Sequence, residues 1–150
     1  LKWPNDIRWK NRKIGGILCE LVPGPEGAIV IIGIGINVNR TRFPEEIDAA
    51  AASLKTATGT GRSVEALFDD TLGRLIELLS GLRIPLDESL VIEWERASRS
   101  IGSRVRFVLQ DREEEGVLSA VNPDGSLRIT TRSGNTIDGY RGEVLFQDDE

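Results

Sequence analysis

Two apolar runs, KIGGILCELV at residues 13–22 and AIVIIGIGINV at residues 28–38, decide the fold of the N-terminal part of this chain. Between them, residues 23–27 read PGPEG, a composition typical of a tight turn. Two such runs joined by a short turn predict a β-hairpin. Because the second run is apolar without a break, it predicts burial on both faces, and we expect helices to cover the sheet.

The middle of the chain contains the candidate helices. Residues 45–54 include four consecutive alanines and are compatible with a short helix. Ser63 is a candidate N-cap, because apolar residues recur at helical spacing over residues 64–82. Gly81 is a candidate end for this helix. A further helix is expected over residues 86–98.

The composition changes after residue 100, where strand patterns alternate with turn sequences. Four short strand patterns lie at residues 105–109, 116–118, 126–130 and 143–146. A segment of this length fits a small SH3-like β-barrel of four or five strands. The expected class is therefore α+β, with a mixed or antiparallel sheet covered by helices in residues 1–99 and the barrel in residues 100–150.

Composition excludes several kinds of protein. The chain has 150 residues, 39% of them hydrophobic, which is enough for one ordinary domain or for a partial domain and a small one. The longest apolar run is far shorter than the roughly 18–20 residues of a membrane span. With no histidine and one cysteine, the chain cannot build the usual zinc site, a histidine-dependent triad or an internal disulfide. Cys19, inside an apolar run, is expected to pack.

Charge and the missing methionine add two expectations. The net charge of −5 argues against nonspecific binding to nucleic acid, which favours a basic surface. The chain contains no methionine, so we expect it to start inside a longer gene product or after processing. Trp9, between Arg8 and Lys10, is expected on a turn, either exposed or touching a partner.

Three short segments place polar residues and glycines where a sheet would otherwise be apolar: residues 2–6 (KWPND), 13–18 (KIGGIL) and 33–38 (GIGINV). Taken one by one, each has two interpretations. Asn5 and Asp6 start a turn or offer oxygen ligands to Mg²⁺. Lys13 meets an anion or lies solvated at a strand edge. Asn37 contacts a ligand or caps a turn. The third segment is no dinucleotide fingerprint, because Val38 stands where a third glycine is needed.

Taken together and in this order, the segments resemble the catalytic domain of biotin protein ligases. That family carries a KWPND motif, then K-(I/L)-(A/G)-G-I-L-x-E, then G-x-G-(I/L)-N, which stand here at residues 2–6, 13–20 and 33–37. The family's A-x-S-L is similar to residues 51–54. The resemblance implies an incomplete biotin/lipoate ligase fold, which is class II synthetase-like, followed by an SH3-like C-terminal domain.

The resemblance also implies a two-step reaction. Biotin and ATP give biotinyl-5′-AMP and pyrophosphate, and a lysine of a biotin carboxyl carrier protein domain then attacks the mixed anhydride. Mg²⁺ would accompany ATP. The implied protein is cytoplasmic and a possible homodimer, and this chain is expected to bind neither nucleic acid nor a membrane.

By the same resemblance, Lys13 is the catalytic residue, beside the biotin carboxylate and the α-phosphate. The residues implied at biotin or the adenylate are Trp3, Asn5, Asp6, Gly15, Gly16 and Asn37. Asn5 and Asp6 are also the implied contacts to Mg²⁺ through the ATP phosphates, without a division of roles between them.

One part of the family pattern has no match. The family's Gly/Arg-rich loop belongs upstream of Lys2, and the Arg-rich residues 7–13 lack its glycines. The chain therefore resembles the C-terminal half of a ligase, and we expect little or no activity from it alone. Three alternatives stay open: a lipoate–protein ligase, a non-catalytic SH3-like binding or dimerisation module, and the core of a DNA-binding repressor.

Overall fold

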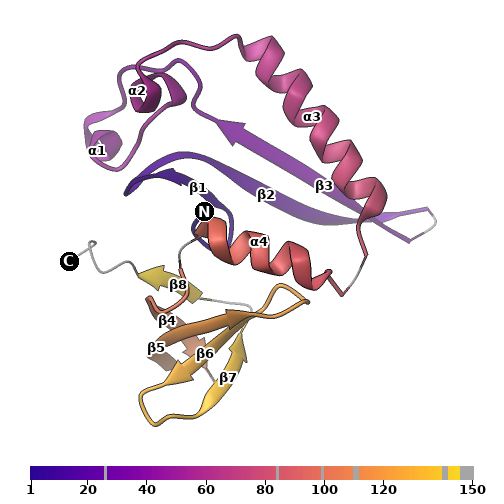
Figure 1. Cartoon of the computed structure of the whole chain (residues 1–150), viewed down its shortest axis with the longest axis vertical. Coiled ribbons are helices and arrows are strands. Elements are labelled where there is room, and N and C mark those ends of the chain that lie inside the picture. Colours follow the sequence, from indigo (N-terminus) through magenta and orange to yellow (C-terminus); the bar gives the residue numbers. More distant parts are fainter. Residues whose placement is uncertain (26, 84, 99, 110–111, 140–141, 146–150) are drawn as a thin grey trace. The chain divides into compact units, whose positions relative to one another are not determined.

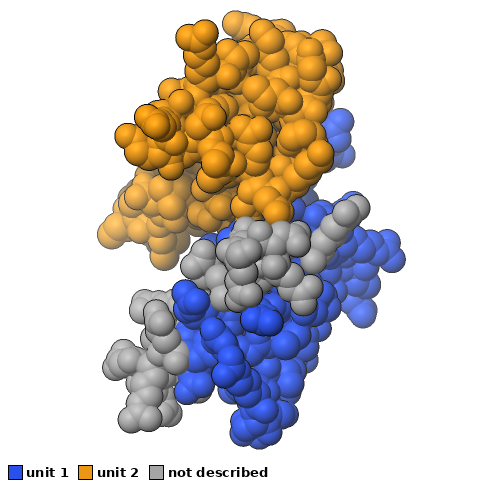
Figure 2. All heavy atoms as spheres, turned by 90° about the vertical axis from the view of Figure 1, so that its left-hand side faces the viewer, with its two compact units in different colours: residues 1–4, 74–150 blue, residues 5–73 orange. Residues whose placement is uncertain are grey.

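The computed structural model describes residues 1–25, 27–83, 85–98, 100–109, 112–139 and 142–145. The chain divides into two compact units (Figure 2). The first unit, residues 5–73, is orange and labelled unit 2 in Figure 2. The second unit, residues 1–4 together with residues 74–150, is blue and labelled unit 1. Each unit has its own antiparallel sheet. Within the described ranges, no helix is both long and apolar enough to cross a membrane.

The first unit is built on a sheet in the order β1-β2-β3 (Figure 1). Its strands are β1 (Asp6–Trp9), β2 (Arg12–Gly24) and β3 (Gly27–Ile36). The long β2–β3 pair confirms the hairpin predicted from the two apolar runs. The sequence did not predict β1, because its four residues have no strand-like alternation and directly follow a turn sequence.

Three helices follow the hairpin: α1 (Glu45–Asp48), α2 (Leu54–Thr58) and α3 (Val64–Gly81). The Ser63 hydroxyl accepts a hydrogen bond from the Ala66 backbone N–H at 3.1 Å, which confirms the predicted N-cap. α3 also ends at Gly81, as predicted.

The helix predicted over residues 45–54 is wrong in its second half. α1 ends at Asp48, and Ala51 instead forms a parallel bridge with Lys13. The Lys13 N–H donates to the Ala50 carbonyl at 2.7 Å, and the Ala52 N–H donates to the Lys13 carbonyl at 2.9 Å. These backbone groups are satisfied by the sheet, so the helix propensity of alanine does not decide their conformation.

The prediction that β3 is buried on both faces is also wrong. Val30 and Ile31 are neighbours on opposite faces of β3, and they are 56% and 49% exposed. Cys19 is exposed too, so it does not pack as expected. An apolar run shows which side chains favour burial, whereas burial itself needs a second layer of structure. The described residues therefore do not give this sheet the expected cover of helices.

The second unit contains α4 (Glu88–Ser98) and a five-stranded antiparallel sheet. The strands are β4 (Arg104–Leu109), β5 (Arg112–Val121), β6 (Leu127–Thr131), β7 (Thr136–Gly139) and β8 (Gly142–Leu145). Their order is β7-β6-β5-β4-β8. The five strands agree with the prediction, but no pairing closes them into a barrel in the part of the chain that the structure describes.

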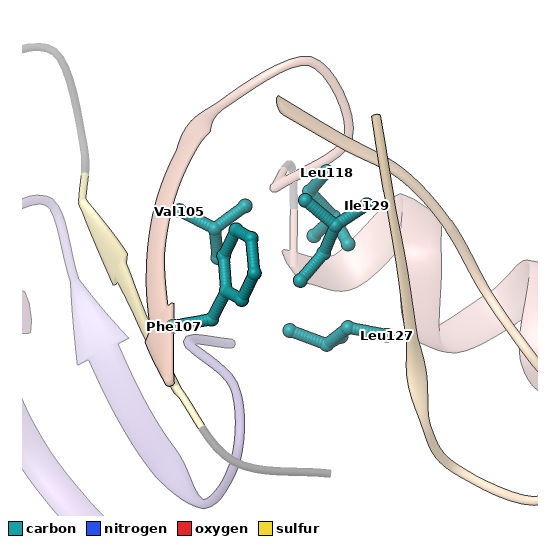
Figure 3. Packing of buried hydrophobic residues seen from close by; sticks show 5 residues of the cluster. All are labelled: Val105, Phe107, Leu118, Leu127 and Ile129. Carbon is teal, nitrogen blue, oxygen red and sulfur yellow. The ribbon is translucent and has the colours of Figure 1, made fainter. Parts of the chain in front are cut away.

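Alternating side chains of β4, β5 and β6 form the buried core of this unit (Figure 3). The core residues, each at most 3% exposed, are Val105, Phe107, Leu118, Leu127 and Ile129. Each buried side chain of this size stabilises the fold by about 1.5–3 kcal/mol.

α4 joins this unit, since Glu95 accepts a hydrogen bond from the Val121 N–H at 2.9 Å. The compact unit thus includes residues on both sides of the domain boundary predicted at residues 99 and 100. That residues 100–150 form a domain of their own stays a prediction.

We expect acid to weaken this second unit through Asp138. The amide of Asn122, and then the guanidinium of Arg128, hold the pKa of the Asp138 carboxyl below its ordinary value of 3.8. The stabilisation is therefore complete above the unfolded pKa and is lost as pH falls through the lowered folded pKa. Urea unfolding of the protein and its Asp138→Asn variant from pH 6 to pH 2.5 checks this. The two proteins should differ near neutral pH and converge in acid, and a constant difference would contradict the assignment.

Candidate functional site

A β-bulge orients Lys13. Ile7 lies opposite Gly15, but the next pair is Arg8 opposite Lys13, so Ile14 is an extra residue in β2. A bulge of this kind redirects the neighbouring side chain. A Cβ placed at Gly16 would lie 3.4 Å from Lys13 Cε and 3.5 Å from Nζ. The Lys13 ammonium therefore lies over the side-chain position that Gly16 leaves vacant.

Asp6 lies opposite Gly16 in the β1–β2 register, and its carboxylate forms an ion pair with Lys13 Nζ. The Lys13 side chain is 52% exposed and that of Asp6 is 25% exposed. The Asn5 carbonyl accepts a hydrogen bond from the Ile17 N–H at 2.9 Å, which fixes the backbone just before Asp6. The structure thus brings Asn5, Asp6, Lys13 and Gly16 together, with an ammonium that a ligand can still reach.

A glycine floor extends from Lys13 across the hairpin. Gly16 lies opposite Gly35, and Leu18 lies opposite Gly33. A Cβ at Gly35 would meet nothing within 4 Å. An open hollow of about 430 Å³ lies here, lined by Asn5, Lys13, Gly16, Ile17, Leu18, Gly33, Ile34 and Gly35. At Gly16, Gly33 and Gly35 no side chain covers the strands, so a ligand can approach the backbone directly.

Gly15 has a structural reason to be glycine. A Cβ at this position would lie 2.5 Å from the Gly35 carbonyl oxygen, closer than real Cβ atoms come to any neighbour. Gly15 is buried, unlike Gly16 beside it. Its role in the packing of β2 against β3 is thus clear, and a contact of Gly15 with biotin stays a prediction.

Asn37 is hydrogen-bonded to the extended segment whose backbone pairs with Lys13. Its side-chain amide donates to the Ala52 carbonyl at 3.1 Å, and Ala52 donates in turn to the Lys13 carbonyl. The Asn37 N–H donates to the Ile14 carbonyl at 2.7 Å. Asn37 is therefore connected to Lys13 through backbone groups, and a direct contact with an adenylate stays a prediction.

The role of residues 50–53 was missed in the sequence. Their only signal was the A-x-S-L pattern, which does not show that this backbone pairs with Lys13. Ser53 is fully buried and closes a capping box at the start of α2. The Thr56 N–H donates to Ser53 Oγ at 3.0 Å, and the Ser53 N–H donates to Thr56 Oγ1 at 2.8 Å. The cap fixes Ser53, which directly follows the residues whose backbone is hydrogen-bonded to Lys13.

Replacing Ser53 with alanine should lower the free energy of unfolding by about 1–2 kcal/mol, because the Thr56 N–H loses the hydroxyl that caps the start of α2. Urea unfolding measures this loss. Ser80→Ala is the matched control, since that hydroxyl lies on exposed α3 and donates to the Ile76 carbonyl within the same helix. Equal stability of the two variants would contradict a structural role for the cap.

Comparisons with known proteins find similarity to biotin protein ligases. A family model described as the biotin/lipoate A/B protein ligase family matches residues 1–37. The chain is 30% identical over 150 residues to the biotin–[acetyl-CoA-carboxylase] ligase of Mycobacterium tuberculosis, with 97% of this chain and 52% of that protein covered. It is also 30% identical over 136 residues to the bifunctional ligase/repressor BirA of Escherichia coli, covering 86% of this chain and 40% of BirA. The chain is therefore similar to biotin protein ligases over nearly its whole length.

Solved structures of biotin protein ligases share the fold. The apo enzyme of Aquifex aeolicus matches with a TM-score of 0.81 and 28% identity, covering 97% of this chain and 64% of that one. The same ligase in complex with biotin and ATP matches with a TM-score of 0.80 and 27% identity, covering 98% and 62%. The chain thus spans about half the length of the curated biotin ligases it matches, and under two thirds of these solved chains.

Trp3 is not among the residues that line the glycine-floored hollow. It belongs to the second unit, where its Nε1 donates to the Gly125 carbonyl at 3.4 Å. It also lines an apolar hollow of about 440 Å³ with Leu86, Leu90 and Trp94. Its contacts are those of a packing residue, and a contact with biotin or the adenylate stays a prediction.

The donor set near Lys13 fits a magnesium ion only in part. No group of three or more His, Cys, Asp or Glu side chains that could hold a metal occurs among the described residues. Asn5 and Asp6 offer one amide and one carboxylate, and this carboxylate is paired with Lys13. Mg²⁺ commonly takes one or two carboxylates and completes its octahedron with water and phosphate oxygens. An ion at this place would therefore depend on a bound triphosphate.

Proposed function

We propose that this chain forms part of the adenylation site of a biotin protein ligase. In the first step a biotin carboxylate oxygen attacks the α-phosphorus of ATP, and pyrophosphate leaves. In the second step the lysine amine of a biotin carboxyl carrier domain attacks the biotinyl carbonyl, and AMP leaves. One observation carries the proposal: an accessible Lys13 ammonium, paired with Asp6, beside a glycine floor on which a flat ligand can lie.

In this proposal Lys13 offsets the repulsion between the two negatively charged substrates of the first step. A carboxylate and a triphosphate repel each other, and negative charge grows on the phosphate oxygens as the new bond forms. A fixed cation next to both groups stabilises the transition state more than the separated substrates. In this proposal Asp6 positions the ammonium before the substrates bind.

Asn5 and Asp6 would also hold Mg²⁺ together with the phosphate oxygens of ATP. The ion would supply positive charge that makes pyrophosphate a better leaving group. The chain's own contribution is to bring Asn5 to the hollow and to pair the Asp6 carboxylate with Lys13.

The glycines and Asn37 would shape the ligand site. Gly16 lets biotin or the adenylate contact the strand backbone, and Gly15 keeps β2 and β3 close enough to form that floor. Asn37 would contact the adenylate through the side-chain oxygen that its bond to Ala52 does not use. In the second unit, the five antiparallel strands support an SH3-like C-terminal domain.

The remaining parts of the proposal concern the whole protein. The acceptor would be a biotin carboxyl carrier domain, the protein would act in the cytoplasm, and a homodimer is compatible with the exposed sheet edge at β3. A second candidate, a non-catalytic binding or dimerisation module, is favoured by the exposed apolar residues of the β2–β3 hairpin.

ATP–pyrophosphate exchange tests the proposal. We expect biotin-dependent exchange by the complete protein that carries this chain, and little or none by the 150 residues alone. Lipoate replaces biotin as the control substrate. Exchange that depends on lipoate would identify a lipoate ligase, and no exchange with either acid would favour the binding module.

A further inference from the structure

The tip of the β1–β2 hairpin carries a concentration of positive charge. Residues 8–12 (RWKNR), here called the basic tip, hold three basic residues and no acidic one, in a chain whose net charge is −5. The hairpin turns at Lys10 and Asn11, between the paired Trp9 and Arg12. The local charge is thus opposite to that of the chain as a whole.

Lys10 occupies a backbone conformation that suits glycine better. Its φ is +51°, in the left-handed region, which costs an ordinary L-residue roughly 1–2 kcal/mol. Its ammonium lies 4.7 Å from the centroid of the Trp9 ring, and the residue is exposed. A strained conformation at an exposed charged residue indicates a role other than stability.

The neighbouring arginines make the tip rigid. The Arg12 guanidinium donates to the Asp48 carbonyl at 3.0 Å, and the Arg8 guanidinium donates to the Asn11 carbonyl. Because these contacts hold the turn in place, Lys10 is presented in one arrangement before any partner arrives. A preformed surface loses little conformational entropy on binding.

The basic tip lies on the same strands as the candidate site. Asp6 and Trp9 are the two ends of β1, and Lys13 follows Arg12 directly in β2. At a rise of about 3.3 Å per residue, roughly 10 Å separate Asp6 from Trp9. A protein that inserts a lysine side chain toward Lys13 and Asp6 would bring its surface within reach of this tip.

We infer that the basic tip docks an acidic surface of the protein acceptor, next to the lysine that receives biotin. This inference rests on the proposed function and adds how the acceptor is recognised. Charge complementarity favours an acidic protein over nucleic acid, because DNA-binding proteins commonly neutralise about 6–10 phosphates and the tip offers three basic residues.

The test compares three variants of the complete protein that carries this chain. Lys10→Gly removes the charge and relieves the strain, Lys10→Gln removes only the charge, and Lys10→Arg keeps the charge. Two activities are measured: biotin-dependent ATP–pyrophosphate exchange, and the initial rate of transfer against concentration of the carrier domain. The transfer assay is run at low salt and at about 0.5 M salt, where screening is strong.

Lys10→Gly and Lys10→Gln should raise the KM for the carrier domain about threefold to tenfold at low salt, with a much smaller effect at high salt. Exchange should be unchanged, and Lys10→Arg should stay within about twofold of the original protein. The Tm of Lys10→Gly should rise by about 2–4 °C, so unfolding cannot explain the higher KM of this variant.

Four outcomes would overturn the inference. An unchanged KM in the two neutral variants, or an increase that salt does not reduce, overturns acceptor docking while exchange still supports the ligase. If the two neutral variants bind a DNA duplex more weakly than the original protein but transfer biotin to the carrier domain equally well, the basic tip is reassigned to nucleic acid. A complete protein without biotin-dependent exchange overturns the proposed function, and acceptor docking with it.

Discussion

Replacing Lys13 with alanine should slow biotinyl-5′-AMP formation by about a hundredfold to a thousandfold, the usual cost of removing one preorganised charge-stabilising group. In the part of the chain that the structure describes, Lys13 is the only basic residue that lines the hollow, so no neighbour there can replace its ammonium. ATP–pyrophosphate exchange by the complete protein measures the effect. The loss should appear in kcat as well as in KM, since the charge that Lys13 stabilises grows toward the transition state.

Two controls make this result specific. Lys55→Ala removes an exposed lysine from α2 in the same unit and should leave exchange within about twofold. Lys13→Arg keeps the charge but not the compact ammonium that pairs with Asp6, so we expect an intermediate rate. Full activity of Lys13→Ala would remove this residue from the catalytic step.

The second large effect is expected on stability, at the glycines where β2 pairs with β3. Gly15→Ala should lower the free energy of unfolding by about 2–4 kcal/mol, because its Cβ would lie 2.5 Å from the Gly35 carbonyl oxygen and β2 and β3 would have to separate. Gly35→Ala is the matched variant on the other strand. Its Cβ meets nothing within 4 Å, so stability should be unchanged or higher by up to about 1 kcal/mol.

Comparing Gly15→Ala with Gly35→Ala distinguishes an effect on strand packing from an effect on ligand binding. Gly35→Ala places a methyl group in the hollow and should raise the KM for biotin or ATP about threefold or more in the complete protein, with an unchanged Tm. Urea unfolding and exchange kinetics measure the two effects. A stable Gly15→Ala, or a Gly35→Ala with unchanged KM values for both substrates, would contradict the proposed floor.

Local patterns predicted several elements well. The β2–β3 hairpin followed from two β-branched runs around a Pro/Gly turn, and the N-cap at Ser63 followed from hydroxyl chemistry and helical spacing. These features depend on neighbours within a few residues, so the sequence contains most of the information. The short strand β1 and the extended segment at Ala51 were not predicted, because each exists through partners far along the chain.

For the candidate site, the sequence by itself determined the chemistry: a lysine, a carboxylate, an amide and glycines, in an order that resembles biotin protein ligases. It did not determine their relation in space. Only the tertiary structure decided that a bulge at Ile14 directs Lys13 over Gly16 toward Asp6, and that Gly15 serves packing while Gly16 and Gly35 leave the hollow open. The physical reason is that residue type sets which interactions are possible, whereas strand register sets which groups meet, and register depends on pairing between distant segments.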